Sequence, residues 1–164
     1  MEGELVIRDV SPADTEAILA IGRELVEEGD TYVFSPTTSD DELKAYWLNP
    51  SGRTFVAVLD GSTAGCYFLR SNYPGRGRHV ANASYAVGRK FMRRGIGRAM
   101  AEHSLEKAKD LGFQAMQFNL VVSTNERAVT LWRTLGFRIV GTLPRVFDHP
   151  TRGLIDAYVM HKFL

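Results

Sequence analysis

A glycine pair, Gly95 and Gly97, separates a run of cationic side chains from a stretch with the spacing of a long helix, which ends at Gly112. Glycines at the start of a helix let a ligand approach the backbone without Cβ atoms in the way. The first amides of a helix have no partner within it and lie at the positive end of its dipole, so they bind anions. Three arginines with guanidinium groups suited to phosphate flank the pair: Arg93, Arg94 and Arg98. These residue types indicate a diphosphate site, although such a turn is as often only an exposed loop.

The elements that would position this loop follow from turn signals and hydrophobic periodicity. The segments that begin at Ser11 and Ser39 have the residue types of helix starts, and Asp60-Gly61 is typical of a hairpin turn. After Asn125, apolar residues recur at helical spacing up to Gly136, where a left-handed cap is expected. The expected order is βααβββαβαββ, with strands at 5–8, 54–59, 64–70, 83–87, 114–122, 138–147 and 154–163. No linker interrupts this order, so we expect residues 1–164 to form a single domain.

Composition excludes several classes of protein. The chain has 164 residues and a net charge of only +1, so no global field draws it to nucleic acid or anionic lipid. No apolar run approaches the ~20 residues that span a bilayer, and the acidic N-terminus is not that of a signal peptide. The single cysteine, Cys66, excludes an internal disulfide and suits a reducing compartment. The histidines lack metal-ligand spacing. We therefore expect a cytoplasmic protein without a metal, a nucleic-acid partner or a membrane partner.

Two sequence blocks resemble the signatures of one family. The first is Met92-Arg93-Arg94-Gly95-Ile96-Gly97, which follows the strand that ends at Val87. The second is Asn125-Glu126-Arg127-Ala128, followed by Leu131-Trp132 and Leu135-Gly136-Phe137. Both resemble the acetyl-CoA-binding region of the GCN5-related N-acetyltransferases (GNAT), and the resemblance covers the whole chain.

The resemblance implies a fold of the α+β (mixed α/β) class, in which helices flank a central, mostly antiparallel sheet. In that family the fourth and fifth strands splay apart, and the pantetheine arm of acetyl-CoA lies in the gap. The cofactor-binding residues that it implies are Tyr85, Ala86, Val87, Met92, Arg93, Arg94, Gly95, Ile96, Gly97, Arg98, Asn125, Ala128 and Trp132.

Acetyl transfer to an amine requires a neutral amine and a stabilised carbonyl oxygen. An amine with a pKa near ~10.4 is almost fully protonated at pH 7, so a base or a water chain is useful. Related acetyltransferases stabilise the carbonyl with backbone amides of the central strand, which points here to Val87 and its neighbours. They often use a strand glutamate as base and a tyrosine as acid, but this chain has neither. The run 79–87 lacks a carboxylate, and Trp132 stands where the tyrosine would be.

Asparagines occupy the predicted central strands instead, Asn82 in one and Asn119 in the next. Asparagine is depleted from strands, and a buried amide must find hydrogen-bond partners. One interpretation is a bulge or a strand-end hydrogen bond. The other comes from a weaker resemblance to a fungal subgroup that acetylates proline analogues such as azetidine-2-carboxylate. In that subgroup asparagines matching Asn82, Asn119 and Asn125 serve substrate, acetyl group and CoA, which makes Asn82 and Asn119 the candidate catalytic residues.

The leading interpretation is an acetyl-CoA-dependent N-acetyltransferase whose acceptor is the amine of a small molecule or amino acid, proline analogues included. One alternative is a protein acetyltransferase that acts on lysine or an N-terminus. A second alternative is a non-catalytic acyl-CoA-binding module, since the usual glutamate and tyrosine are missing. A nucleic-acid patch at 89–98 is disfavoured by the low net charge. The sequence leaves open whether the protein forms a homodimer.

Overall fold

The structure is a computed structural model and describes residues 3–164. The helices and strands follow the order βααβββαβαββ that the sequence predicts, and several short 3₁₀ turns join them. The elements are β1 (Leu5–Asp9), α1 (Thr15–Glu28), α2 (Asp40–Trp47), β2 (Gly52–Leu59), β3 (Ser62–Ser71), β4 (Val80–Val87), α3 (Ile96–Asp110), β5 (Ala115–Val122), α4 (Glu126–Thr134), β6 (Arg138–His149) and β7 (Gly153–Phe163).

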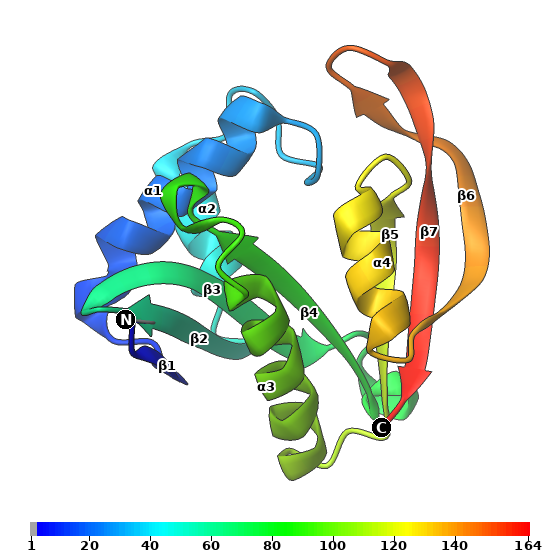
Figure 1. Cartoon of the computed structure of the whole chain (residues 1–164). Helices are drawn as coiled ribbons and strands as arrows, with labels where there is room; N and C mark the ends of the chain where they lie inside the picture. The colour runs from blue at the N-terminus through cyan, green and yellow to red at the C-terminus, as the bar shows by residue number, and fades with distance from the viewer. Residues whose placement is uncertain (1–2) are drawn as a thin grey trace.

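All seven strands form one sheet in the order β1-β2-β3-β4-β5-β7-β6. Neighbouring strands are antiparallel except β4 and β5, which are parallel. Each of these two strands has eight residues, yet they pair only at Val80 with Ala115 and at Ala81 with Met116. Beyond Ala81 they diverge, and Figure 1 shows the open angle between them. The splay implied by the family resemblance is therefore confirmed.

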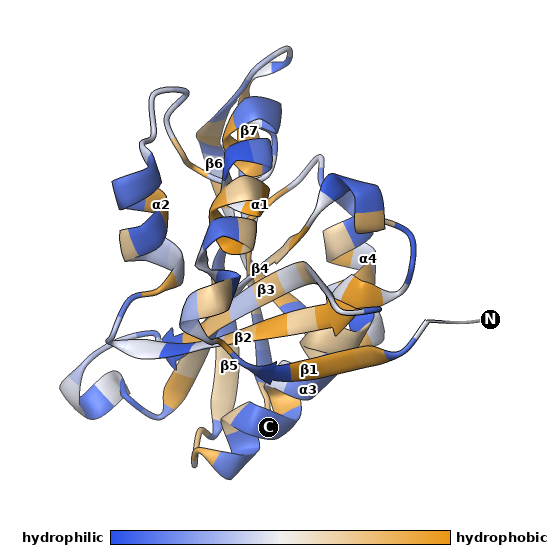
Figure 2. Ribbon diagram, turned by 90° about the vertical axis from the view of Figure 1, so that its left-hand side faces the viewer, coloured by the Kyte–Doolittle hydropathy of each residue, from blue (hydrophilic) through white to orange (hydrophobic). Residues whose placement is uncertain are grey.

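Helices cover both faces of the half of the sheet that contains β3. Successive side chains of a strand point to opposite faces. Tyr67 and Leu69 accordingly pack in a core with residues of α3 and α4, whereas Cys66 and Phe68 pack in a second core with α1 and α2. Burial on two faces explains why the run from Ala64 to Leu69 is continuously apolar. Figure 2 shows the hydrophobic residues concentrated along strands such as β1 and β2, and the hydrophilic ones on outer helix faces.

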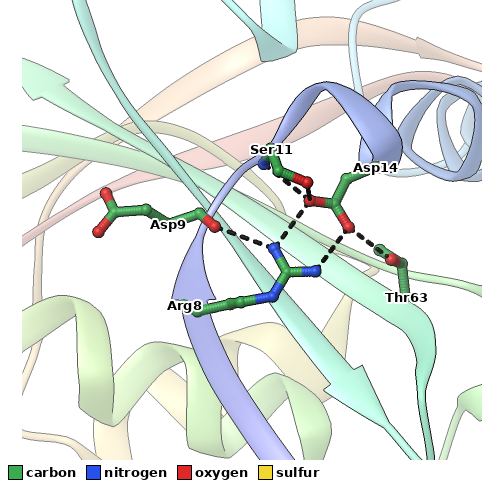
Figure 3. A network of polar contacts seen from close by, with 5 residues as sticks. All are labelled: Arg8, Asp9, Ser11, Asp14 and Thr63. Carbon is green, nitrogen blue, oxygen red and sulfur yellow. Dashed lines mark hydrogen bonds and ion pairs between the residues drawn. The ribbon is translucent and has the colours of Figure 1, made fainter.

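Buried Asp14 ties the N-terminal segment to the sheet (Figure 3). Its carboxylate accepts two hydrogen bonds from the Arg8 guanidinium, at 2.8 and 3.0 Å, and one from the Thr63 hydroxyl at 3.0 Å. The backbone N–H and the hydroxyl of Ser11 also donate to it, at 2.8 Å each. The hydrogen bonds from Arg8 hold the pKa of Asp14 well below its usual range, against the opposing effect of burial.

Local signals set the helix ends as predicted. α2 begins after Ser39, whose hydroxyl accepts from the Glu42 N–H at 3.2 Å, while the Glu42 carboxylate accepts from the Ser39 N–H at 2.7 Å. Gly136, which follows α4, has φ of 89°, the left-handed conformation expected there. None of the helices among residues 3–164 has the length and apolar composition needed to cross a membrane.

Candidate active site

The N-terminus of α3, which follows the loop after β4, has the features of an anion-binding site. Gly95 precedes the helix with φ of 74°, and no side chain caps its first turn. Arg93 also adopts a positive φ, 64°, which is uncommon for a residue with a Cβ. Left-handed residues in such turns direct successive N–H groups into a concave anion-binding nest. In the part of the chain that the structure describes, the N–H groups of residues 93–98 have no hydrogen-bond acceptor, so these backbone donors are available to a ligand.

A pocket of about 240 Å³ lies at this helix start. At Gly97 an added Cβ would meet only Val87 Cγ2, at 3.8 Å, so packing within the protein does not require a glycine there. The glycine instead leaves room at the wall of the pocket. The lining residues are Val87, Phe91, Met92, Arg93, Gly95, Ile96, Gly97, Arg127, Ala128 and Leu131. Uncapped amides, an open wall and cationic side chains fit the diphosphate of a CoA molecule.

The structure brings only part of the predicted cofactor-binding set into this pocket. Val87, Met92, Arg93, Gly95, Ile96, Gly97 and Ala128 line it. Tyr85, Ala86, Arg94, Arg98, Asn125 and Trp132 do not. The prediction omitted three lining residues, Phe91, Arg127 and Leu131. Arg127 and Leu131 belong to the second sequence block, and their spacing on α4 is the signal that could have identified them.

The cationic run of the loop divides into two groups. Arg89 turns away from the pocket, because its guanidinium pairs with Glu27 at 2.9 Å and Glu28 at 3.1 Å on α1. Arg98 pairs with Glu102 at 2.8 Å on its own helix. Within residues 3–164, no ion pair holds Arg93 or Arg94. Fewer arginines are therefore available to bind an anion than the sequence suggests.

Tyr85 and Trp132 belong to the core. The Tyr85 hydroxyl is 2.7 Å from the Ser104 hydroxyl of α3, and burial raises the pKa of Tyr85. The Trp132 ring is buried against Phe118, with ring centroids 4.5 Å apart, and against Tyr85 at 4.9 Å. Trp132 therefore fills space where related enzymes place the tyrosine that acts as the acid, and Tyr85 is a packed aromatic.

Asn125 caps α4, as its sequence position predicts. Its side-chain oxygen accepts a hydrogen bond from the Ala128 N–H at 3.3 Å. A further role toward CoA stays a prediction.

Asn82 and Asn119 are not hydrogen-bonded to each other. Asn82 Nδ2 donates to the backbone oxygen of Gln117 at 3.0 Å, across the splay. Asn119 lies where the pairing of β5 with β7 shifts register, and its amide exchanges hydrogen bonds with Asn72, at 2.7 and 3.2 Å. The register shift at Asn119 is the irregularity that the structural interpretation predicts, whereas Asn82 lies inside β4, one residue beyond the last pairing with β5. Their catalytic roles stay predictions.

The sequence reasoning missed Tyr32, which lies between α1 and α2. The Tyr32 hydroxyl donates to the Tyr85 carbonyl oxygen at 2.8 Å and accepts from the Tyr85 N–H at 2.8 Å. It therefore occupies both backbone groups of one β4 residue on the edge that faces the splay. No motif identifies this tyrosine, because the contact joins segments far apart in sequence and depends on the departure of β5.

A second concave region lies where β4 and β5 begin, at the other end of the sheet from the α3 N-terminus. This open groove of about 890 Å³ is lined by Arg76, Arg78 and His79, among other residues. His79 lies in this groove. The groove has no uncapped helix start, so the smaller pocket fits the diphosphate of a CoA molecule better.

Cys66 is buried in the second core, away from the pocket at α3. Burial raises the pKa of the Cys66 thiol to about 12, which makes it a packing residue. No group of three or more potential metal ligands occurs among residues 3–164.

The acetyltransferase (GNAT) family model matches residues 21–137, which is more than half of the chain. The chain belongs to this family. Members of this family transfer an acetyl group from acetyl-CoA to an amine, so acetyl-CoA is the co-substrate that family membership implies.

Individual relatives agree with this membership. The N-acetyltransferase aca1 of Schizosaccharomyces pombe is 34% identical over 116 residues, which cover 68% of this chain and 54% of the yeast protein. The chain thus spans about half the length of that curated relative. A GCN5-related N-acetyltransferase from Kribbella flavida superposes with a TM-score of 0.94 at 44% identity, covering 98% of both chains. A ribosomal-protein-alanine N-acetyltransferase from Brucella melitensis gives 0.85 at 27% identity, covering 97% of this chain and 99% of the other.

Proposed function

We propose that this acetyltransferase acts on the amine of a small molecule, with amino acids and proline analogues as candidate acceptors. The observation that carries the proposal is the close approach of two segments across the splay. Gly29 ends α1 on one half of the sheet, and Pro150 lies in the β6–β7 turn on the other. A Cβ at Gly29 would lie 3.3 Å from Pro150 Cγ, tighter than ordinary van der Waals contact. In Figure 1 both segments lie above the gap between β4 and β5, so together they restrict entry for a long peptide.

Polar groups on the α1–α2 face of the sheet suit a small charged acceptor. The Tyr46 hydroxyl of α2 is 2.8 Å from the Ser84 hydroxyl of β4. Arg70 of β3 is paired in register with Asn82, so their side chains lie on the same face as Ser84. Arg70 forms no ion pair within residues 3–164, and its guanidinium lies 5.7 Å from the Phe68 ring centroid. A guanidinium without an acidic partner is suited to bind a carboxylate of the acceptor.

The proposal also assigns roles at the cofactor pocket. The first amides of α3, with Arg93 and Arg94, hold the diphosphate of acetyl-CoA, and the β4 edge near Val87 pairs with the pantetheine arm. Asn82 then faces the acceptor amine. The support is the uncapped helix start, the glycine wall and the splay.

An N-terminal amine of a protein is the second candidate acceptor, because the Brucella relative is described as a ribosomal-protein-alanine N-acetyltransferase. The two candidates differ in one chemical respect. A free amino acid carries an α-carboxylate beside the amine, whereas a peptide N-terminus does not. The close approach of Pro150 to Gly29 favours the small acceptor.

The test is release of free CoA from acetyl-CoA in the presence of single acceptors. The panel contains free amino acids, azetidine-2-carboxylate, their carboxamides and short peptides that begin with alanine or contain lysine. We expect turnover with a free amino acid or proline analogue to exceed turnover with every peptide. Faster acetylation of a peptide would contradict the proposal and favour a protein acceptor.

A further inference from the structure

The β4 edge that faces the splay has backbone groups without a strand partner. In an antiparallel pair, alternate residues direct their N–H and C=O groups toward the neighbouring strand. The Gly88 N–H faces the β3 side, because it donates to the backbone oxygen of Ala64 at 2.9 Å. Tyr85 faces the opposite side, because both its N–H and its C=O are bonded to the Tyr32 hydroxyl. Val87 is two residues from Tyr85, so its N–H and C=O point to the same side. A ligand that extends along this edge therefore first meets the backbone groups of Val87. At Tyr85 it meets the Tyr32 hydroxyl, which is bonded to both backbone groups of that residue.

Aromatic packing fixes the place of the Tyr32 hydroxyl. The Tyr32 ring stacks on Phe34 with centroids 5.6 Å apart and meets the edges of Trp47 and Tyr46 at 5.8 and 6.3 Å. Trp47 is fully buried in the second core. Because the ring has little freedom, the hydroxyl stays at the β4 edge while its hydrogen is free to rotate about the C–O bond.

We propose that the Tyr32 hydroxyl is the hydrogen-bond donor to the thioester carbonyl oxygen of bound acetyl-CoA. At rest its hydrogen points to the Tyr85 carbonyl oxygen. With the thioester beside it, the hydrogen turns to the thioester oxygen, while the Tyr85 N–H continues to donate to the phenol oxygen. The chain N–H···O–H···O=C is cooperative, which makes the phenol a stronger donor than it is alone. The inference rests on the family reaction and not on the choice of acceptor.

Tyr32 keeps its proton throughout the reaction. The acceptor nitrogen forms a bond to the acetyl carbon, the C–S bond breaks, and the sulfur leaves with the bonding electron pair. The nitrogen gives its proton to water, and the carbonyl oxygen carries extra negative charge only while the bonds change. A donor aimed at that charge lowers the barrier. Burial raises the pKa of Tyr32 well above its ordinary value, which suits a hydrogen-bond donor and not a proton donor.

The direct test is the infrared carbonyl stretch of acetyl-CoA labelled with ¹³C at the acetyl carbonyl, bound without an acceptor. A hydrogen bond lowers the frequency of this stretch. We expect a lower frequency on the wild-type protein than in water, and a return toward higher frequency in Tyr32→Phe. The matched control is Tyr67→Phe, which removes the hydroxyl of another buried tyrosine, one that bonds His103 of α3 at 2.7 Å. The control should keep the wild-type frequency.

Kinetics give a second readout, with the best acceptor of the panel. Loss of an oxyanion donor lowers turnover by about 10²–10³-fold, so Tyr32→Phe should show that loss, while its dissociation constant for acetyl-CoA should rise far less. An unchanged carbonyl frequency and turnover in Tyr32→Phe would overturn the proposal. If that variant does not fold, 3-fluorotyrosine at position 32 replaces it. The more acidic phenol should lower the carbonyl frequency further, and no change would equally overturn the proposal.

Discussion

The Asn82 side chain bridges the point at which the central sheet opens. Its Nδ2 atom donates to the backbone oxygen of Gln117 at 3.0 Å, although backbone pairing between β4 and β5 ends one residue earlier, at Ala81. The Asn82 side chain thus supplies a donor to the Gln117 carbonyl, which has no backbone partner on β4 because the two strands have already diverged. Asn82 Oδ1 makes no hydrogen bond within residues 3–164, so it remains available to accept from an amine.

Asn82→Ala should therefore affect both stability and acceptor binding. The Gln117 carbonyl loses its donor, which costs about 1–3 kcal/mol of unfolding free energy. The acceptor amine loses the oxygen that orients it, so kcat/KM for the acceptor should fall by at least ~10-fold, which corresponds to about 1.4 kcal/mol. The dissociation constant for acetyl-CoA should stay near the wild-type value. Denaturation, acceptor kinetics and calorimetric titration measure the three quantities, and wild-type acceptor kinetics would leave Asn82 with a structural role alone.

Gly97→Glu should abolish acetyl-CoA binding with the fold retained. The new side chain enters the pocket and places a carboxylate beside the phosphates, while a Cβ at this position meets only Val87 at 3.8 Å. Lys109→Gln is the control, because it changes the net charge by the same amount in the last turn of the same helix. Stabilisation of the folded protein by acetyl-CoA, measured by thermal unfolding, should disappear only in Gly97→Glu. Equal stabilisation of both variants would place the cofactor elsewhere.

Asp14→Asn should destabilise the protein in a pH-dependent way. The folded-state pKa of Asp14 is lowered, so its contribution to stability is fully present above its unfolded pKa of ~3.9 and is lost as pH falls below that value. At pH 6 we expect a loss of about 1–3 kcal/mol, toward the lower end because the Arg8 side chain is 44% exposed. Urea denaturation from pH 6 to pH 2.5 should show the difference from wild type shrinking toward acid. A difference independent of pH would contradict this account of the Asp14 network.

Pro150→Gly should widen the range of acceptors. The substitution removes the ring that approaches Gly29 across the splay and loosens the β6–β7 turn. Turnover with an alanine-terminated peptide should rise relative to turnover with the free amino acid. Pro74→Gly, in the turn between β3 and β4, is the control for loss of a loop proline, which alone costs about 0.4–1 kcal/mol. An unchanged ratio in Pro150→Gly would show that this contact does not select the acceptor.

The sequence predicts the features that depend on neighbouring residues. Ser39 with Glu42, Asp60-Gly61 and Gly136 mark element ends through local backbone chemistry, and the structure follows them. Gly95 and Gly97 likewise lie at the start of α3, where the sequence predicts a helix to begin. The order of elements and most of the pocket wall were therefore predictable.

Long-range relationships were not predictable in the same way. Arg89 resembles its cationic neighbours in sequence, but glutamates of α1 hold it in the fold. Asn119 signals an unusual strand position without revealing that Asn72 is its partner. Tyr32 acquires its place only because β5 leaves the β4 edge open. Each depends on contacts between segments more than forty residues apart, which no periodicity encodes.

The most direct test of the central claim is a map of the acetyl-CoA site by backbone amide resonances. Titration of the ¹⁵N-labelled protein with acetyl-CoA should shift the amide signals of Val87, Ile96, Gly97 and Arg98 most strongly, since these lie at the β4 edge and in the first turn of α3. The open groove with Arg76, Arg78 and His79 should show little change. Strong shifts in that groove, with the signals of residues 95–98 unmoved, would contradict the assignment of the cofactor site.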